Sequence, residues 1–472
     1  MRFRPSRAAD RVPSNYRTST GSFATVYYDA NGKLFSPSGY SVTIISRPAG
    51  TVRSLTDCQF LSGVTVNARP MTTLQTPGPT IGVVGGGQLG RMLAEAAAPL
   101  GVEVVVLDPT PDCPAAPVAR DQIVADFDDE AGIRELAARA DVLTFEIELA
   151  DQDVLERVSE DSGTPVHPEP ATLETIHDKL VQKRELEDAG VPVPPFRAVD
   201  DPADIRAAID DYGAPVMLKA RTGGYDGRGN VPVESKADAE AALDSVAGPA
   251  MVEAFVEFER EISIIAVKGA AERNSANRED DPRDDHEIAT FPIGENVHED
   301  EILRETIVPA GSSDAVAERA RGVASDVLDV MKGRGVYGIE LFETSDGEIL
   351  LNEIAPRPHN SGHWTIEGAQ SSQFEQHARA VLGWPLASTD LRSPTVSVNL
   401  LGDVEESQSA TLHHADRILE TPGAALHWYG KREARPLRKL GHVTLSGRDD
   451  ETTAELLETA RELERSVTFT SE

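Results

Sequence analysis

The chain has 472 residues, enough for two to four domains, and its formal charge of −34 results from 79 acidic and 45 basic residues. So large a negative charge argues against nucleic-acid binding, and no apolar run approaches the length that spans a membrane. The two cysteines, Cys58 and Cys113, belong to no paired Cys/His pattern. The sequence therefore predicts neither a disulfide framework nor a zinc site, and it fits a reducing cytoplasm.

Lysine occurs at only nine positions in this acidic chain. An acidic, lysine-poor surface is what a protein in very high salt would carry, because salt screens the repulsion between like charges there. We therefore predict a halophilic protein. The scarcity of lysine also makes each remaining one a candidate functional residue.

The first seventy residues differ in composition from the rest. They carry nine basic and three acidic residues, a charge of +6, which leaves −40 for the other 402 residues. Only Ser41–Ile45 has a strand-like pattern. We interpret residues 1–76 as a disordered extension, or as the result of a translation start placed upstream of Met71. A basic targeting arm is the alternative.

Strands and helices alternate from Pro79 onward, which predicts a small doubly wound parallel sheet in an N-terminal domain, residues 77–170. We expect strands at 80–84, 102–107, 121–125 and 141–146, and helices at 88–99 and 130–139. Further helical patterns cover 171–189 and 202–212, and a strand covers 216–220.

A second domain is predicted over 171–384 and a small β-rich domain over 385–472, with a closing amphipathic helix at 451–464. The fold class is thus α/β and α+β. The acidic insert at 271–286 is expected to be a surface loop.

The segment Gly85–Gly90 follows a strand and opens a helix, and Asp108 ends the next strand 18 residues later. This spacing matches the dinucleotide-binding fingerprint and alone would favour an NAD enzyme. Its physical content is narrower, since glycines let backbone N–H groups approach any anion at a helix N-terminus. A tight turn without ligand is the structural alternative.

A second glycine-rich run, Lys219–Asn230, places four glycines within seven positions after an apolar strand. It is not a Walker A motif, because no Lys-Ser/Thr pair follows the glycines. We expect a mobile loop that closes over phosphates, with Lys219 aiming a cation at the same place. Downstream, the link between two strands near Val256 could offer backbone groups to an adenine edge. Glu261 could bind ribose or be an ordinary surface residue.

The most informative stretch is a hairpin signal, Asp346-Gly347, between two apolar runs. If these two residues form the turn, Glu340 falls opposite Glu353, on a face shared with Phe342, Ile349, Leu351 and Ala355. Two facing carboxylates with little water need a shared proton or a cation, and hard oxygens suit Mg²⁺. An edge hairpin with two solvated glutamates is the alternative.

Near the C-terminus, residues 427–442 concentrate positive charge in the acidic chain. A phosphate site is the economical explanation. A cationic patch that balances neighbouring acids is the alternative.

Together these motifs resemble the 5-(carboxyamino)imidazole ribonucleotide synthases, an ATP-grasp family of purine biosynthesis, from about Thr80 to about Leu445. The matching segments are GGQLGRM (86–92), TFEIE (144–148), DKL with QK (178–183), RTGGYDGRG (221–229), NEIAPRPHNSGHWT (352–365) and LHWYGK (426–431). The last two separate this family from other ATP-grasp ligases. One departure is Glu301, where family members often have glycine.

The resemblance implies an ATP-grasp fold between the doubly wound domain and the C-terminal domain, with ATP and Mg²⁺, or Mn²⁺ in its place, as cofactors. Lys179 and Lys219 would contact the ATP phosphates. Glu340 and Glu353 would hold the metal. The remaining ATP-binding residues would be the lid Gly224, Tyr225, Asp226, Gly227, Arg228, Gly229 and Asn230, then Glu253, Ala254, Phe255 and Val256 at the adenine, Glu261 and His298 near the ribose, and Asn352.

The second substrate would be aminoimidazole ribonucleotide. Tyr225, Lys431 and Arg438 would bind its phosphate, with Lys431 counted also among the catalytic residues, and Gln88 and Glu146 would line its ribose. Bicarbonate, and the carboxyphosphate made from it, would lie among Arg357, His359, Asn360 and Ser361, and Asp226 would handle the amine proton.

The resemblance also implies a homodimer and hand-over of the product to the mutase that follows. The alternatives are another ATP-grasp ligase (a formate-using transformylase or a biotin-carboxylase-like enzyme), an NAD-dependent oxidoreductase and a non-catalytic nucleotide-binding regulator.

Overall fold

The computed structural model describes residues 74–223, 229–246, 248–271, 286–448 and 451–470, and three short strands before residue 74. The chain divides into two compact units, Met1–Thr73 and Leu74–Glu472. The first contains an antiparallel sheet that was not predicted: β1 (Ser14–Arg17), β2 (Phe23–Tyr28) and β3 (Leu34–Phe35). The strand predicted at 41–45 lies outside the described residues. In the ranges given above, no helix has both the length and the apolar character needed to cross a membrane.

The second unit begins with a parallel sheet in the order β6-β5-β4-β7, which confirms the predicted doubly wound domain. Every residue of β4 is buried, as expected for a strand covered on both faces. The elements are β4 (Thr80–Val84), α1 (Gln88–Ala97), the 3-10 turn η2 (Ala98–Leu100), β5 (Glu103–Leu107), β6 (Asp121–Ile123), α2 (Glu130–Arg139), β7 (Val142–Phe145) and α3 (Gln152–Ser162).

The helical pattern over 171–189 forms two helices rather than one, α4 (Pro170–His177) and α5 (Lys179–Asp188). Asp178 separates them, because its carboxylate accepts hydrogen bonds from the backbone N–H groups of Leu180 and Val181 and caps α5. Arg221 also binds this carboxylate, with its Nε 3.0 Å from Oδ1. The break places Lys179 at the first turn of a new helix, where its backbone N–H donates to Arg221 O at 2.9 Å, one residue beyond the strand Val216–Ala220.

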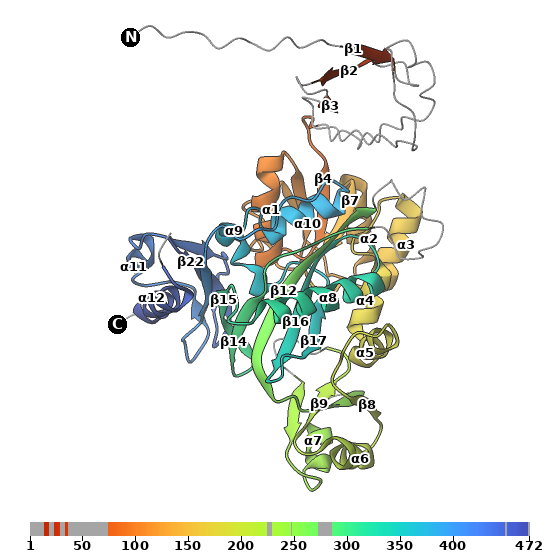
Figure 1. The fold of residues 1–472 in the computed structure, drawn as a ribbon, viewed down its shortest axis with the longest axis vertical. Helices are drawn as coiled ribbons and strands as arrows, with labels where there is room; N and C mark the ends of the chain where they lie inside the picture. The colour runs from red at the N-terminus through yellow and green to blue at the C-terminus, as the bar shows by residue number, and fades with distance from the viewer. Residues whose placement is uncertain are drawn as a thin grey trace, which may run out of the picture. The chain divides into compact units, whose positions relative to one another are not determined.

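A small antiparallel sheet, in the order β10-β9-β11-β8, follows at one end of the unit (Figure 1). Its strands are β8 (Phe196–Val199), β9 (Val216–Ala220), β10 (Asn230–Val233) and β11 (Ala250–Ala254). Helices α6 (Pro202–Tyr212) and α7 (Ala239–Ser245) pack on it and share its apolar core. Residues 224–228, the tip of the predicted lid, lie outside the described residues.

A nine-stranded sheet forms the centre of the unit, in the order β17-β16-β12-β14-β15-β18-β22-β20, with β13 beside β12. It crosses the predicted boundary between residues 384 and 385, because β15 pairs with β18. The insert between β12 and β13, residues 272–285, lies outside the described residues. The strands are β12 (Phe258–Ala271), β13 (His286–Thr290), β14 (Gly294–Glu299), β15 (Ile302–Val308), β16 (Gly335–Thr344), β17 (Ile349–Ala355), β18 (Thr395–Leu401), β20 (Ala424–Trp428) and β22 (Lys439–Ser446).

Helices cover the large sheet, and the longest is α8 (Asp314–Val330), in contact with β12, β16 and β17. The C-terminal helix α12 (Thr453–Ser466) corresponds to the predicted amphipathic helix. The remaining elements are the 3-10 turn η3 (Asn360–Gly362), α9 (Thr365–Gly368), α10 (Gln373–Val381), β19 (Gln408–Ser409), α11 (Asp416–Leu419) and β21 (Glu433–Ala434).

Alternation along β12 separates the core from the site. Ile262 and Ile264 are fully buried in the core that α8 covers, whereas Glu261 and Ser263 lie on the opposite face. Ser263 pairs with Glu340 on the neighbouring strand β16. This second face of the sheet therefore carries polar side chains on several neighbouring strands.

Candidate active site

The predicted pairing of Glu340 with Glu353 is confirmed, but the hairpin that produces it differs from the prediction. The turn has three residues rather than two, because Thr344 pairs with Glu348 around a left-handed Gly347 at φ +78°. This shifts the register by one residue. A bulge between Leu341 and Glu340, which leaves Asn352 unpaired on β17, shifts it back.

The bulge also changes which side chains accompany the two glutamates. Ile349 and Leu351, predicted on the same face, are buried in the core on the opposite face of the sheet. This part of the prediction was wrong, because a bulge reverses the alternation of the strand beyond it. Phe342 stays on the face of Glu340 and stacks on Phe258, with ring centroids 5.0 Å apart.

The two facing carboxylates have different environments. The Glu340 side chain is 16% exposed, and burial raises its pKa to about 7, against the smaller effect of His298. The Glu353 side chain is 52% exposed and lies 3.5 Å from Lys179 Nζ, whose charge lowers its pKa. A divalent cation would relieve this asymmetry by favouring the ionised form of Glu340. Oxygen ligands on adjacent strands therefore fit Mg²⁺.

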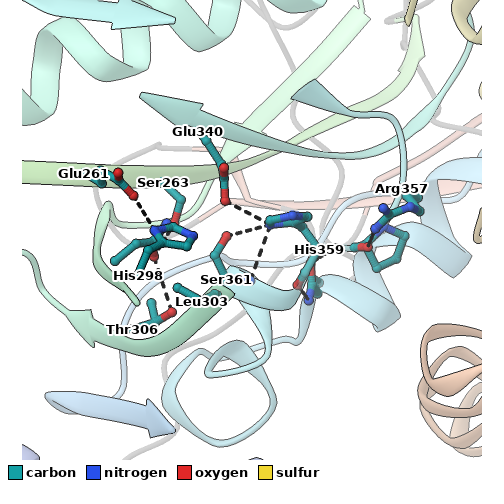
Figure 2. Close-up of polar contacts among 12 residues, drawn as sticks. Glu261, Ser263, His298, Leu303, Thr306, Glu340, Arg357, His359 and Ser361 are labelled. Carbon is teal, nitrogen blue, oxygen red and sulfur yellow. Dashed lines mark hydrogen bonds and ion pairs between the residues drawn. The ribbon is translucent and has the colours of Figure 1, made fainter. Parts of the chain in front are cut away.

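Two further strands extend this polar face. His298 on β14 contacts the carboxylate of Glu261 on β12, and both lie near Glu340, as Figure 2 shows. Burial opposes protonation of His298, but the bond to Glu261 and the charge of Glu340 outweigh it and raise its pKa. The structure thus brings together the two residues predicted near the ribose, and they adjoin the predicted metal ligand.

The small sheet contributes an almost completely buried charge cluster. Glu253 accepts from Lys219 Nζ at 2.9 Å through Oε2, and Lys183 Nζ lies 3.2 Å from Oε1. Burial alone would raise the pKa of Glu253, but the two ammonium groups lower it to about 2. The carboxylate of Glu253 is therefore engaged by lysines rather than turned toward an adenine. Of the other residues predicted there, Ala254 and Val256 are half-buried and Phe255 is exposed.

The residues predicted to hold bicarbonate lie together after β17. His359 Nδ1 is 2.9 Å from Ser361 Oγ and 4.0 Å from Glu340 Oε1 (Figure 2). Arg357 Nη2 pairs with Glu148 Oε1 at 2.8 Å. Within the described part of the chain, both side-chain polar atoms of Asn360 are buried without a hydrogen-bond partner. An amide that lacks partners in a polar cluster is suited to bind a small oxyanion.

The first glycine motif binds a carboxylate of the protein itself. Glu146 accepts hydrogen bonds from the backbone N–H groups of Gly87 and Gly90 at the start of α1, the second at 2.6 Å. Burial raises the pKa of Glu146 to about 7 against these bonds. A Cβ at Gly85 would lie 2.4 Å from Glu146 Cγ. Gln88 begins α1 at the same place.

Asp108, the residue that would bind the ribose of a dinucleotide, instead forms hydrogen bonds within the protein. The Asp108 carboxylate is buried and accepts from the backbone N–H groups of Gly86, at 3.0 Å, and Thr110, at 2.8 Å. It shapes the glycine loop and is not directed outward. This geometry disfavours the NAD interpretation.

The C-terminal basic segment contacts the N-terminal domain. Arg432 lies 3.1 Å from Asp112, and a Cβ at Gly430 would lie 3.1 Å from Arg91 of α1. In the same segment, Lys431 Nζ donates to Lys439 O at 2.8 Å and Arg438 Nη1 donates to Glu433 O at 2.9 Å. The structure therefore places the predicted phosphate ligands on a loop beside α1. Tyr225 and Asp226 lie outside the described residues.

Two residues of the candidate site, Lys183 and Glu148, were given no role in the sequence analysis. Lys183 joins the small and large sheets, since its Nζ also donates to Leu351 O at 3.0 Å. Two features of the sequence could have indicated it: lysine is rare in this chain, and Lys183 lies on the buried stripe of α5, three residues after Leu180. Glu148, the partner of Arg357, lies in a matching motif, but only the tertiary contact reveals its role.

Comparison with known proteins agrees with this arrangement. Three family profiles match in chain order: a ribonucleotide synthetase preATP-grasp domain over residues 79–177, an ATP-grasp domain over 184–374 and a phosphoribosylaminoimidazole carboxylase C-terminal domain over 395–456.

The N5-carboxyaminoimidazole ribonucleotide synthase of Brucella melitensis is 45% identical over 371 residues, which are 78% of this chain and 96% of that protein. The Bacillus subtilis protein of the same name is 37% identical over 78% of this chain and 91% of its own length.

Solved structures agree in fold. The synthetase of Thermotoga maritima has a TM-score of 0.72 at 39% identity, covering 84% of this chain and 100% of that one. The Aspergillus clavatus synthase, solved with ADP and 5-aminoimidazole ribonucleotide, has a TM-score of 0.72 at 34% identity, covering 82% and 97%. The chain therefore belongs to the N5-carboxyaminoimidazole ribonucleotide synthase family of ATP-grasp ligases.

Proposed function

We propose that this protein carboxylates aminoimidazole ribonucleotide with bicarbonate, at the expense of ATP, in purine biosynthesis. Family membership supports the overall reaction. The observation that carries the assignment of residues is the position of Glu340. It faces Glu353, which Lys179 approaches, and it lies 4.0 Å from His359 Nδ1. Glu340 therefore lies between Lys179, which is suited to bind a phosphate, and His359, which is suited to bind bicarbonate.

The first step is phosphoryl transfer. An oxygen of bicarbonate attacks the γ-phosphorus of ATP, the bond to the bridging oxygen of ADP breaks, and carboxyphosphate forms. Lys179 and Lys219 neutralise phosphate charge, while Arg357 and His359 orient bicarbonate. Such transfers depend mainly on positioning and charge stabilisation, because the protein forms no covalent bond itself.

The second step forms the carbon–nitrogen bond. The exocyclic amine attacks the carboxyl carbon of carboxyphosphate, or of carbon dioxide released from it in the site, phosphate leaves, and the amine loses a proton. Lys431 and Arg438 bind the ribonucleotide phosphate, and Gln88 and Glu146 lie on its ribose side. Asp226 is our candidate for the proton, with the loop 224–230 and Tyr225 completing the site.

Glu340 and Glu353 would hold Mg²⁺, or Mn²⁺ in its place, which when bound supplies charge stabilisation at the transferring phosphoryl group. Among the described residues no set of three or more His, Cys, Asp or Glu side chains is arranged around a common metal position. This fits a magnesium ion that takes two carboxylates and completes its shell with phosphate oxygens and water. Asn352 at the bulge and the Glu261–His298 pair complete the ATP side.

The decisive experiment measures ADP release with bicarbonate, with and without aminoimidazole ribonucleotide. We expect release to need all three substrates for full rate and the carboxylated ribonucleotide to form in equal amount. Formate in place of bicarbonate tests the transformylase alternative, and a biotinylated acceptor in place of the ribonucleotide tests the biotin-carboxylase alternative. Product formation with either substitute, and not with bicarbonate and ribonucleotide, would overturn the proposal. We further propose a cytoplasmic homodimer that passes its unstable product to the following mutase.

A further inference from the structure

Lys183 is a buried cation that the proposed reaction does not use. Its side chain is 2% exposed, so it cannot reach a substrate. Its Nζ lies 3.2 Å from Glu253 Oε1 and donates to Leu351 O at 3.0 Å. It therefore ties α5 to the small sheet and to β17, which also carries Glu353.

Glu253 is shared between two lysines of unequal accessibility. Lys219 binds the other oxygen, Oε2, at 2.9 Å and is 11% exposed, so it forms the outer end of the cluster. A phosphate that draws Lys219 away would remove one of the two charges that keep Glu253 ionised. A buried carboxylate left without any partner is strongly unfavourable. If Lys183 carried no charge, Glu253 would therefore retain Lys219 and oppose its movement to the phosphate.

We propose that Lys183 is a positioning residue, which keeps Glu253 ionised and in place while Lys219 transfers to the phosphates of ATP. This inference rests on the proposed function in one respect, since it takes Lys219 as a phosphate ligand. The pKa of Lys183 agrees with such a role, because burial lowers it to about 8 against the attraction of Glu253. Lys183 thus remains largely protonated at neutral pH and can carry the charge alone.

The rival role is purely structural, a lysine that satisfies the carbonyl of Leu351 and nothing more. The chain offers a matched control for it. Lys268 is also almost fully buried, at 1% exposure, and donates to two backbone carbonyls, Leu328 O and Met331 O, each at 2.9 Å. Loss of its charge should affect folding without affecting nucleotide binding.

The test is calorimetry of ADP with Mg²⁺ on the full chain and on K183Q, K268Q, E253Q and K183Q/E253Q, together with the KM values for both substrates. Glutamine removes the charge and retains an N–H donor on a side chain one bond shorter, a change that K268Q shares. We expect K183Q to weaken ADP binding and raise the KM for ATP at least tenfold, with the KM for the ribonucleotide within twofold. K268Q should leave ADP binding within twofold even if its Tm falls. K183R should restore most of the lost affinity.

A role exerted through Glu253 must vanish with Glu253. We therefore expect the ADP affinities of E253Q and K183Q/E253Q to lie within threefold of each other. If K183Q alone does not fold, this comparison tests the proposal in its place. An ADP affinity of K183Q equal to that of K268Q, or a tenfold loss in the E253Q background, would overturn the proposal. Failure of the proposed function would look different: the parent would bind ADP but form no carboxylated ribonucleotide.

Discussion

Glu340 and Glu353 lie directly opposite each other on β16 and β17, although the hairpin between them departs twice from a regular ladder. The three-residue turn and the bulge at Asn352 displace the register by one residue in opposite directions. The same bulge leaves Leu351 in the core and Glu353 on the polar face. Pairing and placement of the two carboxylates thus depend on both irregularities together.

Glu340→Gln should abolish most of the turnover without harming the fold. Loss of the metal's charge stabilisation at the phosphoryl group should raise the barrier by roughly 3 kcal/mol, about a hundredfold in rate. High Mg²⁺ should rescue only part of this loss. ADP release checks the expectation, with Glu348→Gln at the exposed turn as control. Near-normal turnover of Glu340→Gln at ordinary Mg²⁺ would show that Glu340 is not a metal ligand.

The same substitution predicts a pH dependence of stability. Because burial raises the pKa of Glu340 from 4.5 to about 7, the folded state binds more protons than the unfolded state between these values. The free energy of unfolding in EDTA should therefore fall as pH rises from about 4.5 to 7, by an amount on the order of 2 kcal/mol. Glu340→Gln should lack this component and unfold no earlier than the parent at pH 8. An identical slope in both proteins would contradict the assignment.

Lys431→Ala should raise the KM for the ribonucleotide at least tenfold and leave ATP affinity near normal, because losing one charged hydrogen bond to a phosphate amounts to about 1.5–3 kcal/mol. Steady-state kinetics with each substrate varied separately measure this. Arg435→Ala is the matched control, since Arg435 lies in the same basic loop but is 58% exposed and paired with Glu433. Equal losses for both substrates would refute the assignment of Lys431.

The sequence predicted most of the elements because their signals are local. Strand–helix alternation located the parallel sheet, and β4, α2, α6 and β9 have the predicted bounds. The break at Asp178 was missed, since the apolar stripe continues from α4 into α5 and only the capping bonds end the first helix. Lys183 and Glu253 are seventy residues apart, so no local pattern could pair them.

Stability should rise substantially with KCl. The predicted halophilic character rests on a charge of −40 over residues 71–472, and screening weakens the repulsion among exposed carboxylates. Thermal unfolding from 0.1 to 3 M KCl, compared with a series in an uncharged osmolyte, would separate screening from general exclusion effects. A Tm that does not change with KCl would count against a halophilic protein.

A chain that starts at Met71 should keep its Tm and its activity. The charge changes sign near this residue, and Leu74–Glu472 forms a compact unit by itself. The three strands of the first unit pair with one another. Thermal unfolding and ADP release of the full and shortened chains measure the difference. Loss of folding or of activity in the shortened chain would show that the first seventy residues are needed.

Glu301→Gly should stabilise the protein. The turn between β14 and β15 consists of Asp300 and Glu301, both left-handed, at φ +50° and +63°. Glutamate is strained in this conformation and glycine is not, but glycine has more freedom to lose on folding. The balance should be a gain of about 0.5–1 kcal/mol in the free energy of unfolding. Glu301→Ala is the control, because it removes the same charge and keeps the strained Cβ. If both variants gain equally, charge rather than backbone strain accounts for the effect, whereas a gain confined to glycine places the strain at Glu301.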